Sequence, residues 1–364
     1  MQDGKISDTT RIKACLPTIK DLMHRGAFVI VMSHLGRPKG VDQSLSLRPI
    51  AVELGHELWG EVKFAYDCVG PQAESAVSRL PQGGVLMLEN VRFHPEDEQN
   101  DPEFARQLAS LGEIFCLDAF ASSHRAHASV VGVAQYLPAY AGHLMQAELE
   151  ALHAVLDRPN RPLVAVIGGA KVSTKIELLN NLITKVDDIL IGGAMANTFL
   201  KAQGKPTGNS LVDSESVQAA NDIWKTAGRH LVLPVDLMCT QQTISGQPLR
   251  VFPVDGIEPG WIAVDIGPQT IELFASHIKG AGTVVWNGPM GIFEVKDFAT
   301  GTRAIGEAIA TSGAYSLVGG GDTAAAVEAL GFQGRYSHVS TGGGATLEYL
   351  EGKDLPGVAV LREA

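Results

Sequence analysis

The sequence predicts an α/β protein made of two doubly wound, parallel-sheet (Rossmann-like) domains. The chain has 364 residues, which exceeds the roughly 250–300 residues at which a single hydrophobic core stops growing. A repeated unit runs along it: a short apolar run rich in β-branched residues, a loop that contains glycine, and a helical pattern. That order is typical of parallel strands joined by crossover helices.

The predicted strands fall into two groups. In the first half they cover 27–32, 62–65, 85–88 and 114–117, and in the second half 163–167, 188–191, 230–233, 283–286 and 314–318. Between the groups, apolar residues recur at helical spacing from Gly142 to Leu156 and stop before two prolines. We therefore expect a first domain at 1–142, a connecting helix at 143–157 and a second domain at 158–345.

Composition limits the classes of partner and location. The net charge of -11 disfavours nucleic acid and acidic lipid, which both need a broad basic surface. The apolar runs are far shorter than the roughly 20 residues of a membrane-spanning helix, and the first residues lack the apolar segment of a secretory signal. The 4 cysteines are widely spaced, with no Cys-x-x-Cys pair, which suits a reducing compartment. We expect a soluble, cytoplasmic protein.

The second half contains a glycine-rich segment with two lysines. It runs from Gly168 to Lys175 (GGAKVSTK), directly after a predicted strand. We expect this segment to open a helix, so that its backbone N–H groups and the helix dipole favour a bound phosphate. Lys171 and Lys175 would then share one face of the first turns and neutralise phosphate oxygens. The segment has neither the Walker A spacing nor the dinucleotide fingerprint Gly-x-Gly-x-x-Gly.

Three more glycine clusters occupy predicted strand-to-helix junctions, at 192–197, 319–323 and 342–346. In an open α/β sheet such junctions lie at the carboxyl ends of strands, where ligands bind. Asp322 and Thr323 open a predicted helix, so they could cap it, contact Mg²⁺ or phosphate, or do both. The segment 287–294 follows a strand and is typical of turns, although Glu294 could accept hydrogen bonds from ribose hydroxyls.

Arginine and histidine gather at the predicted strand ends of the first half. The segments SHLGRP at 33–38, ENVRF at 89–93 and SSHRAH at 122–127 each follow a strand, and Arg11 opens the first helix. A single such residue is most often part of a surface salt bridge, but several at one edge suit capture of phosphate or carboxylate. A metal site at His124 and His127 is disfavoured, because no third ligand has suitable spacing.

Together and in this order, the motifs resemble the phosphoglycerate kinase family, from Gly4 to the end of the chain. The resemblance rests on SHLGRP at 33–38, ENVRF at 89–93, HRAH at 124–127, GGAKV at 168–172, WNGPMG at 286–291 and GGDT at 320–323. It implies a monomeric enzyme of glycolysis and gluconeogenesis. Such an enzyme reversibly transfers a phosphoryl group between ATP and the carboxylate of 3-phosphoglycerate, giving ADP and 1,3-bisphosphoglycerate, with Mg²⁺ bound to the nucleotide.

The resemblance also implies roles for individual residues. For binding of 3-phosphoglycerate by the N-terminal domain it implies Arg11, His34, Leu35, Gly36, Arg37, Arg92 and Arg125. For binding of ATP or ADP by the C-terminal domain it implies Lys175, Gly267, Asn287, Glu294, Gly320, Gly321, Asp322 and Thr323, with Asp322 also near the Mg²⁺ ion. For catalysis it implies Lys171, Arg11 and Gly343, with Lys171 contacting the transferring phosphoryl group.

The chemistry of the implied reaction agrees with the residues present. The acceptor carboxylate is already ionised at neutral pH, so no general base is needed. A loose phosphoryl-transfer transition state needs positioning and cationic stabilisation above all. Because the substrates would lie on different domains, we expect the connecting helix to act as a hinge that lets the domains close. We also expect the C-terminal tail, about 346–364, to return to the first domain.

The sequence departs from the family pattern at its beginning. The family opens with a strand that carries Arg-Val-Asp-x-Asn-x-Pro, and this chain, of the bacterial type, begins just beyond it, as a truncated member would. We therefore expect unpaired strand edges in the first domain, poor folding of that half and weak or no activity. A nucleotide-binding remnant without turnover is the alternative. An NAD-linked dehydrogenase rests on fold analogy alone and lacks the dinucleotide fingerprint.

Overall fold

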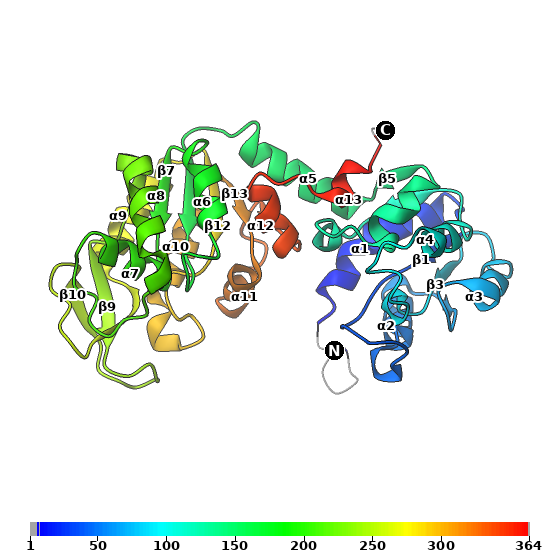
Figure 1. Ribbon diagram of the computed structural model, residues 1–364, viewed down its shortest axis with the longest axis horizontal. Helices are drawn as coiled ribbons and strands as arrows, with labels where there is room; N and C mark the ends of the chain where they lie inside the picture. Colours follow the sequence, from blue (N-terminus) through cyan, green and yellow to red (C-terminus); the bar gives the residue numbers. More distant parts are fainter. Residues whose placement is uncertain (1–5, 7, 363–364) are drawn as a thin grey trace. The chain divides into compact units, whose positions relative to one another are not determined.

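The computed structural model describes residues 6 and 8–362 and divides the chain into two compact units. Unit 1 comprises the chain up to Leu149 together with the residues from Asp354 onward, and unit 2 comprises Glu150–Lys353. The division falls within helix α5 (His143–Leu156), at the position where the sequence predicts a connecting helix (Figure 1). The α/β class with parallel sheets is confirmed.

Unit 1 alternates short strands with helices. Its strands are β1 (Val29–Val31), β2 (Val62–Phe64), β3 (Val85–Met87), β4 (Phe115–Leu117) and β5 (Ala139–Ala141). Its α-helices are α1 (Thr10–His24), α2 (Arg48–Leu58), α3 (Gly70–Val77), α4 (Pro102–Ala109), the first part of α5, and α13 (Pro356–Ala359). Single turns of other helix types are η1 (Gln43–Leu45), η2 (Val91–Phe93), η3 (Phe120–Ser122), η4 (Ala128–Gly132) and η5 (Val133–Gln135).

The strands of unit 1 form two parallel sheets rather than one. The first has the order β1-β3-β2, and the second pairs β4 with β5. Among the described residues β1 bonds only to β3 and β4 only to β5. Every open sheet has two such edge strands, so the absence of an inner strand stays a prediction. Helix α1 reaches the end of the second sheet, where the Thr18 hydroxyl accepts a hydrogen bond of 2.8 Å from the His143 amide.

Part of the core of unit 1 lies between the first sheet and the helices beside it. Leu16 and Ile19 of α1 and Leu54 of α2 pack with Val29 and Val85 of the sheet. The C-terminal segment belongs to the same unit: α13 lies near β5 in Figure 1, and the Arg362 amide donates to the Ala139 carbonyl at 2.9 Å. The chain thus returns to its first unit after the second is complete.

Unit 2 is built on a six-stranded parallel sheet of order β14-β13-β12-β6-β7-β8. These strands are β6 (Leu163–Ile167), β7 (Asp188–Ile191), β8 (Leu231–Val232), β12 (Thr283–Asn287), β13 (Tyr315–Val318) and β14 (His338–Val339). The α-helices are α6 (Ile176–Ile183), α7 (Gly193–Ala202), α8 (Val217–Ala227), α9 (Pro268–Lys279), α10 (Thr300–Thr311), α11 (Gly321–Ala329) and α12 (Gly344–Leu350). Single turns are η6 (Ser214–Ser216), η7 (Gly228–His230) and η8 (Lys296–Phe298).

A second, antiparallel sheet in unit 2 was not predicted from the sequence. It has the order β10-β9-β11 and consists of β9 (Asp236–Thr240), β10 (Arg250–Pro253) and β11 (Ile262–Ile266). The carboxylates of Asp236 and Asp265 interrupt the apolar pattern of β9 and β11, and three of the four residues of β10 are exposed. The expectation of a purely parallel second domain was therefore incomplete.

All nine predicted strands match the structure to within two residues at each end. Two further strands of the parallel sheets, β5 and β14, were not predicted, because they are short and lack β-branched runs. Within the described part of the chain, no helix combines the length and the apolar character needed to cross a bilayer.

Candidate functional site

Four glycine-bearing loops leave one edge of the six-stranded sheet. Gly168 follows β6, Gly192 follows β7, Gly288 follows β12 and Gly319 follows β13, and these strands are neighbours in the order β13-β12-β6-β7. Because the strands are parallel, their carboxyl ends meet at the same edge, where ligands bind in open α/β sheets. The predicted convergence is confirmed for the clusters at 168–175, 192–197 and 319–323, while the cluster at 342–346 follows the edge strand β14. The loop with Gly288 joins them, although the sequence predicted only turns there. We call the four loops after β6, β7, β12 and β13 the glycine-loop site.

The loops of the glycine-loop site are packed against one another. A Cβ atom on Gly168 would lie 2.0 Å from the Pro289 carbonyl oxygen, so this position excludes any side chain. The Met195 amide donates to the Gly169 carbonyl at 2.9 Å, and the Gly193 amide donates to the Met290 carbonyl at 3.0 Å. The backbones are therefore held in place before any ligand binds.

Lys175 lies at the centre of the glycine-loop site. Its Nζ donates to the main-chain oxygen of Asn287 at 3.2 Å and to the side-chain oxygen of the same residue. Burial lowers the pKa of Lys175 to about 8, while the charge of Asp322 acts in the opposite direction. Among the described residues no carboxylate lies within ion-pair distance of Lys175, so its positive charge is available to a phosphate.

The two lysines do not share the first turns of a helix, and that prediction was wrong. Helix α6 begins at Ile176, with Lys175 as its N-cap, and Lys171 is exposed in the preceding loop. Gly169 has φ +122, which a helix does not allow, and the Lys175 amide donates to the Val172 carbonyl at 2.8 Å in a separate turn. The loop thus has its own conformation ahead of the helix.

Of the roles left open for Asp322 and Thr323, capping of α11 is excluded. The N-cap is Gly320, with φ 93, and no side chain caps the helix. The hydroxyl of Thr323 instead accepts a hydrogen bond of 2.7 Å from the Gly288 amide, and the Asn287 side-chain amide donates to the Gly319 carbonyl at 2.9 Å. Asn287 and Thr323 therefore hold the loops after β12 and β13 together.

The other predicted residues of unit 2 differ in their surroundings. Gly321 and Asp322 are exposed in the first turn of α11, Glu294 is exposed after the turn that follows β12, and Gly343 precedes α12 with open space around it. Gly267 follows β11 of the antiparallel sheet, and a Cβ there would lie 2.3 Å from the Asp236 carboxyl carbon. Close packing against Asp236 therefore explains why position 267 is glycine. Gly267 is not part of the four loops of the glycine-loop site.

Asp213 belongs to the glycine-loop site, and sequence reasoning missed it. Its carboxylate accepts hydrogen bonds from the Ser173 amide at 3.0 Å and the Ser216 hydroxyl at 2.9 Å. The hydrogen bond from Ser173 is the main cause that lowers the pKa of Asp213. The bond from Ser216 and the positive charge of Lys171 lower this pKa further. It lies 40 positions away from Ser173, in a loop without a motif, so no sequence signal marked it.

Arginine and histidine side chains gather in unit 1, at the carboxyl ends of its strands. We call His34, Arg37, Arg92, Arg125 and His127 the arginine–histidine cluster. An open pocket is lined by Arg37, Arg125 and His127 together with Glu98. The structure therefore brings these predicted residues together and adds Glu98, which the sequence analysis did not select.

Asn90 positions the loop beneath the cluster. It is fully buried, and its side-chain amide donates to the Leu35 carbonyl at 2.8 Å and the Leu45 carbonyl at 3.0 Å. Its side-chain oxygen accepts from the Arg92 amide at 3.1 Å. The loop that carries His34 and Gly36 is thereby joined to the segment that carries Arg92.

Arg92 is buried with part of its hydrogen-bonding capacity unused. Its side chain is 5% exposed and its Nε lies 3.2 Å from the Glu98 carboxylate. One terminal nitrogen, Nη1, donates to the Gly36 carbonyl at 2.8 Å, whereas the other, Nη2, is buried without a hydrogen-bond partner among the described residues. Burial lowers the pKa of Arg92. An unsatisfied, buried guanidinium nitrogen is a suitable donor to an anion.

The positive charges of the cluster act on one another. Burial lowers the pKa of His34 to about 4, and the charges of Arg92 and Arg125 add to this effect, as does that of Arg11 on α1. His34 is therefore neutral at pH 7, and the surrounding field is positive. Two carboxylates, Glu98 and Asp97, lie beside the cluster, and Asp97 is 3.6 Å from His127. Three arginines still leave an excess of positive charge, which favours a ligand with several negative charges.

Comparison with known proteins decides the family. The family model described as "Phosphoglycerate kinase" matches residues 1–353. The chain belongs to the phosphoglycerate kinase family. It is 53% identical to the phosphoglycerate kinase of Moorella thermoacetica, over 100% of this chain and 93% of that relative. It is 51% identical to the protein of the same name from Pelotomaculum thermopropionicum, over 99% and 93%.

Solved structures of phosphoglycerate kinases have the same fold. The structure from Coxiella burnetii matches with a TM-score of 0.92 at 43% identity and covers 99% of this chain and 92% of that one. The structure from Pyrococcus horikoshii matches with a TM-score of 0.86 at 32% identity and covers 99% and 93%. The recognition of the family from sequence motifs is thus confirmed.

Proposed function

We propose that this chain transfers a phosphoryl group reversibly between ATP and the carboxylate of 3-phosphoglycerate. The observation that carries the proposal is the presence of two separate groups of cations that lack full compensation by carboxylates. One is Lys175 with Lys171 at the glycine-loop site, and the other is the arginine–histidine cluster. A kinase needs such groups for its donor and its acceptor, because both ligands are anionic.

At the glycine-loop site, the backbone and the lysines would hold the nucleotide. The loops after β6, β12 and β13 place N–H groups and helix starts at one edge, and Lys175 supplies a desolvated positive charge. We assign Lys171, in the exposed loop, to the transferring phosphoryl group, and Gly320 to Thr323 to the nucleotide phosphates. Glu294, Gly267 and Gly343 keep the roles that the family resemblance implies, as parts of the same proposal.

Asp322 fits a Mg²⁺ ion bound with the nucleotide. Its carboxylate is exposed in the first turn of α11 and its charge reaches Lys175, and carboxylate oxygen is a ligand that Mg²⁺ prefers. When bound, the ion would neutralise charge on the phosphate oxygens. The chain's own contribution is to position the phosphates and to hold the half-buried Lys175 beside them.

In unit 1, the arginine–histidine cluster would hold 3-phosphoglycerate. Arg92 offers its unsatisfied Nη2 atom, Arg37 and Arg125 line the open pocket, and neutral His34 can donate or accept one hydrogen bond. The pocket provides positioning rather than proton transfer, since the reacting carboxylate needs no base. Arg11 contributes positive charge from the start of α1.

Transfer requires the two ligands to meet, so the proposal includes a hinge in the segment that contains α5. It also includes a monomeric state, as the family resemblance implies, and a cytoplasmic location. The 4 free cysteines of the chain favour that location, because thiols stay reduced in the cytoplasm. The family match over residues 1–353 and the high identity to curated kinases favour this function over a nucleotide-binding remnant.

Separate binding measurements test the division of roles. We expect Lys175→Met to weaken binding of Mg-ADP and to leave binding of 3-phosphoglycerate unchanged, when each is measured by calorimetry. We expect Arg125→Gln to do the reverse, because its charge acts in the other unit. If either variant remained folded and bound both Mg-ADP and 3-phosphoglycerate more weakly by the same factor, the assignment of one ligand to each site would be wrong.

A further inference from the structure

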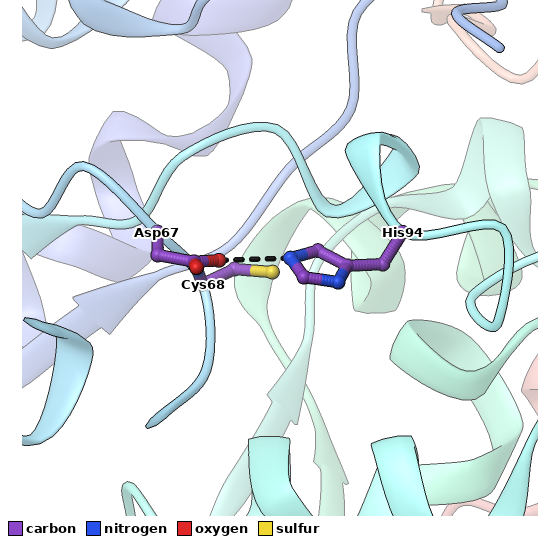
Figure 2. Close-up of side chains that lie close together, drawn as sticks. All are labelled: Asp67, Cys68 and His94. Atoms are coloured by element: carbon purple, nitrogen blue, oxygen red, sulfur yellow. Dashed lines mark hydrogen bonds and ion pairs between the residues drawn. The ribbon is translucent and has the colours of Figure 1, made fainter. Parts of the chain in front are cut away.

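Unit 1 contains a group of three potential metal ligands that the kinase reaction does not use. They are Asp67, Cys68 and His94, and one ligand atom from each lies within 4.8 Å of the other two. Among the described residues this is the one such group of histidine, cysteine and carboxylate side chains. Figure 2 shows the Cys68 sulfur, the Asp67 carboxylate and the His94 ring pointing toward one another.

The topology of the sheet brings these residues together. Asp67 and Cys68 follow β2, and His94 follows η2, which comes shortly after β3. Strands β2 and β3 are parallel neighbours, so the segments after them leave the same edge of the sheet. A carboxylate and a thiol from one loop thus approach an imidazole from another, although His94 is 26 positions beyond Cys68 in the sequence.

Existing contacts hold the three side chains in place and leave them able to bind an ion. The Nε2 atom of His94 lies 2.8 Å from Oδ1 of Asp67, and the Cys68 amide donates to the same oxygen at 2.7 Å. The His94 ring also packs on Phe104, with ring centroids 5.2 Å apart. The side chains of Asp67 and His94 are 39% and 31% exposed, whereas Cys68 is fully buried. The group is therefore open to solvent on one side.

The electrostatic surroundings favour a cation. The negative charges of Asp67, Asp97 and Glu89 act at the position of the Cys68 sulfur. These charges would stabilise a metal ion beside the sulfur. A coordinating thiol releases its proton to solvent when the ion binds.

We propose that Asp67, Cys68 and His94 bind a transition-metal dication of the zinc class. The ligands would be the Cys68 sulfur, Nε2 of His94 and a carboxylate oxygen of Asp67, with water at the open side. Sulfur, nitrogen and oxygen ligands in one set suit Zn²⁺ and its neighbours in the transition series, and disfavour Mg²⁺ or Ca²⁺, which prefer oxygen alone. The site is thus distinct in chemistry from the nucleotide's Mg²⁺.

Small movements would complete the coordination. Zinc–ligand distances of about 2.0–2.3 Å in a tetrahedral site separate the ligand atoms by about 3.3–3.7 Å. The carboxylate and imidazole would therefore open from their present hydrogen-bond distance by about half an ångström, or Asp67 would present its other oxygen. An ion at this position would join the turn after β2 to the end of η2, the turn that contains Arg92.

Metal titration of the folded, reduced chain tests the proposal. Co²⁺ and Zn²⁺ are added separately, without nucleotide or phosphoglycerate. We expect one equivalent of Co²⁺ to bind with a near-ultraviolet thiolate-to-cobalt absorption, and Zn²⁺ to displace it. Cys68→Ser should abolish the absorption, and His94→Gln should weaken binding by about tenfold or more. His94 is partly exposed, so the second variant answers the question even if Cys68→Ser does not fold.

Matched controls exclude binding elsewhere. Cys116→Ser alters a free cysteine of the same unit, and His56→Gln alters a histidine with 74% side-chain exposure on α2; both should bind Co²⁺ like the parent chain. The proposal is overturned if the parent chain binds no stoichiometric metal ion. It is equally overturned if the cobalt absorption persists in Cys68→Ser, or if His94→Gln binds as tightly as the parent.

Discussion

The amino group of Lys175 donates to the main-chain oxygen of Asn287 at 3.2 Å, and this contact joins the end of the loop after β6 to the end of β12. The lysine is thereby held, half-buried, at the edge of the sheet and without a carboxylate in contact among the described residues. Its position explains how a chain of net charge -11 can present a local site for a phosphate.

The pH dependence of stability tests the environment of Lys175. Burial lowers its pKa from 10.5 to about 8 in the folded protein, so between these values the unfolded chain binds more protons and stability rises with pH. We expect the stability of the parent chain relative to Lys175→Met to increase by at most about 3 kcal/mol from pH 8 to pH 10.5. Chemical denaturation at both pH values measures this, and a constant difference would contradict it.

The stability of the protein at acidic pH tests the environment of His34. Its pKa falls from 6.5 to about 4 on folding, so the unfolded chain binds an extra proton in this window and stability is lost as pH falls through it. We expect His34→Gln to reduce the loss of stability between pH 6.5 and pH 4 by at most about 3 kcal/mol. The control His56→Gln, at an exposed side chain of the same unit, should leave the acid limb of the denaturation profile unchanged.

Gly168 should tolerate no side chain. A Cβ there would lie 2.0 Å from the Pro289 carbonyl oxygen, so Gly168→Ala must displace the loop after β12. We expect a loss of more than about 3 kcal/mol in the free energy of unfolding. Gly280→Ala is the matched control, because nothing lies within 4 Å of its Cβ position, and it should change stability by less than about 0.5 kcal/mol. Equal effects of the two substitutions would refute the packing argument.

Asp213 should support nucleotide binding although no motif marks it. Asp213→Ala removes the acceptor for the Ser173 amide, which loosens the loop between Gly168 and Lys175. A lost hydrogen bond of about 1 kcal/mol predicts roughly fivefold weaker binding of Mg-ADP. Asp222→Ala serves as the control. Asp222 lies in α8 of the same unit, and its carboxylate accepts a hydrogen bond from the Gln218 side chain. Unchanged nucleotide affinity in Asp213→Ala would remove Asp213 from the site.

The central sheet of unit 2 could be predicted because its strands are buried on both faces. Leu163–Ile167 is fully buried, and a strand in that environment must be apolar throughout. The glycine clusters could be predicted for a related reason: backbones approach closely at the sheet edge, as at Gly168, and only glycine fits. Apolar runs and glycine clusters are both local patterns, so they can be recognised in the sequence alone.

Other features depend on contacts between distant residues. Asn90 bonds to Leu35, 55 positions away, and Asp213 bonds to Ser173 across 40 positions. No local pattern encodes either contact. The start of α6 was misplaced because a lysine pair four residues apart fits a helix as well as a loop, and the turn formed by Gly169 and Val172 decides between them. The antiparallel sheet was missed because Asp236 and Asp265 occupy structural positions inside its strands.

Formation of ADP from Mg-ATP, measured with and without 3-phosphoglycerate, tests the central claim most directly. The claim is that a lysine-bearing donor site and an arginine-bearing acceptor site serve one reaction. It predicts ADP formation, whatever its rate, that requires 3-phosphoglycerate and is lost in both Lys175→Met and Arg125→Gln. ADP formation that is independent of 3-phosphoglycerate, or that survives in Arg125→Gln at the parent rate, would contradict it.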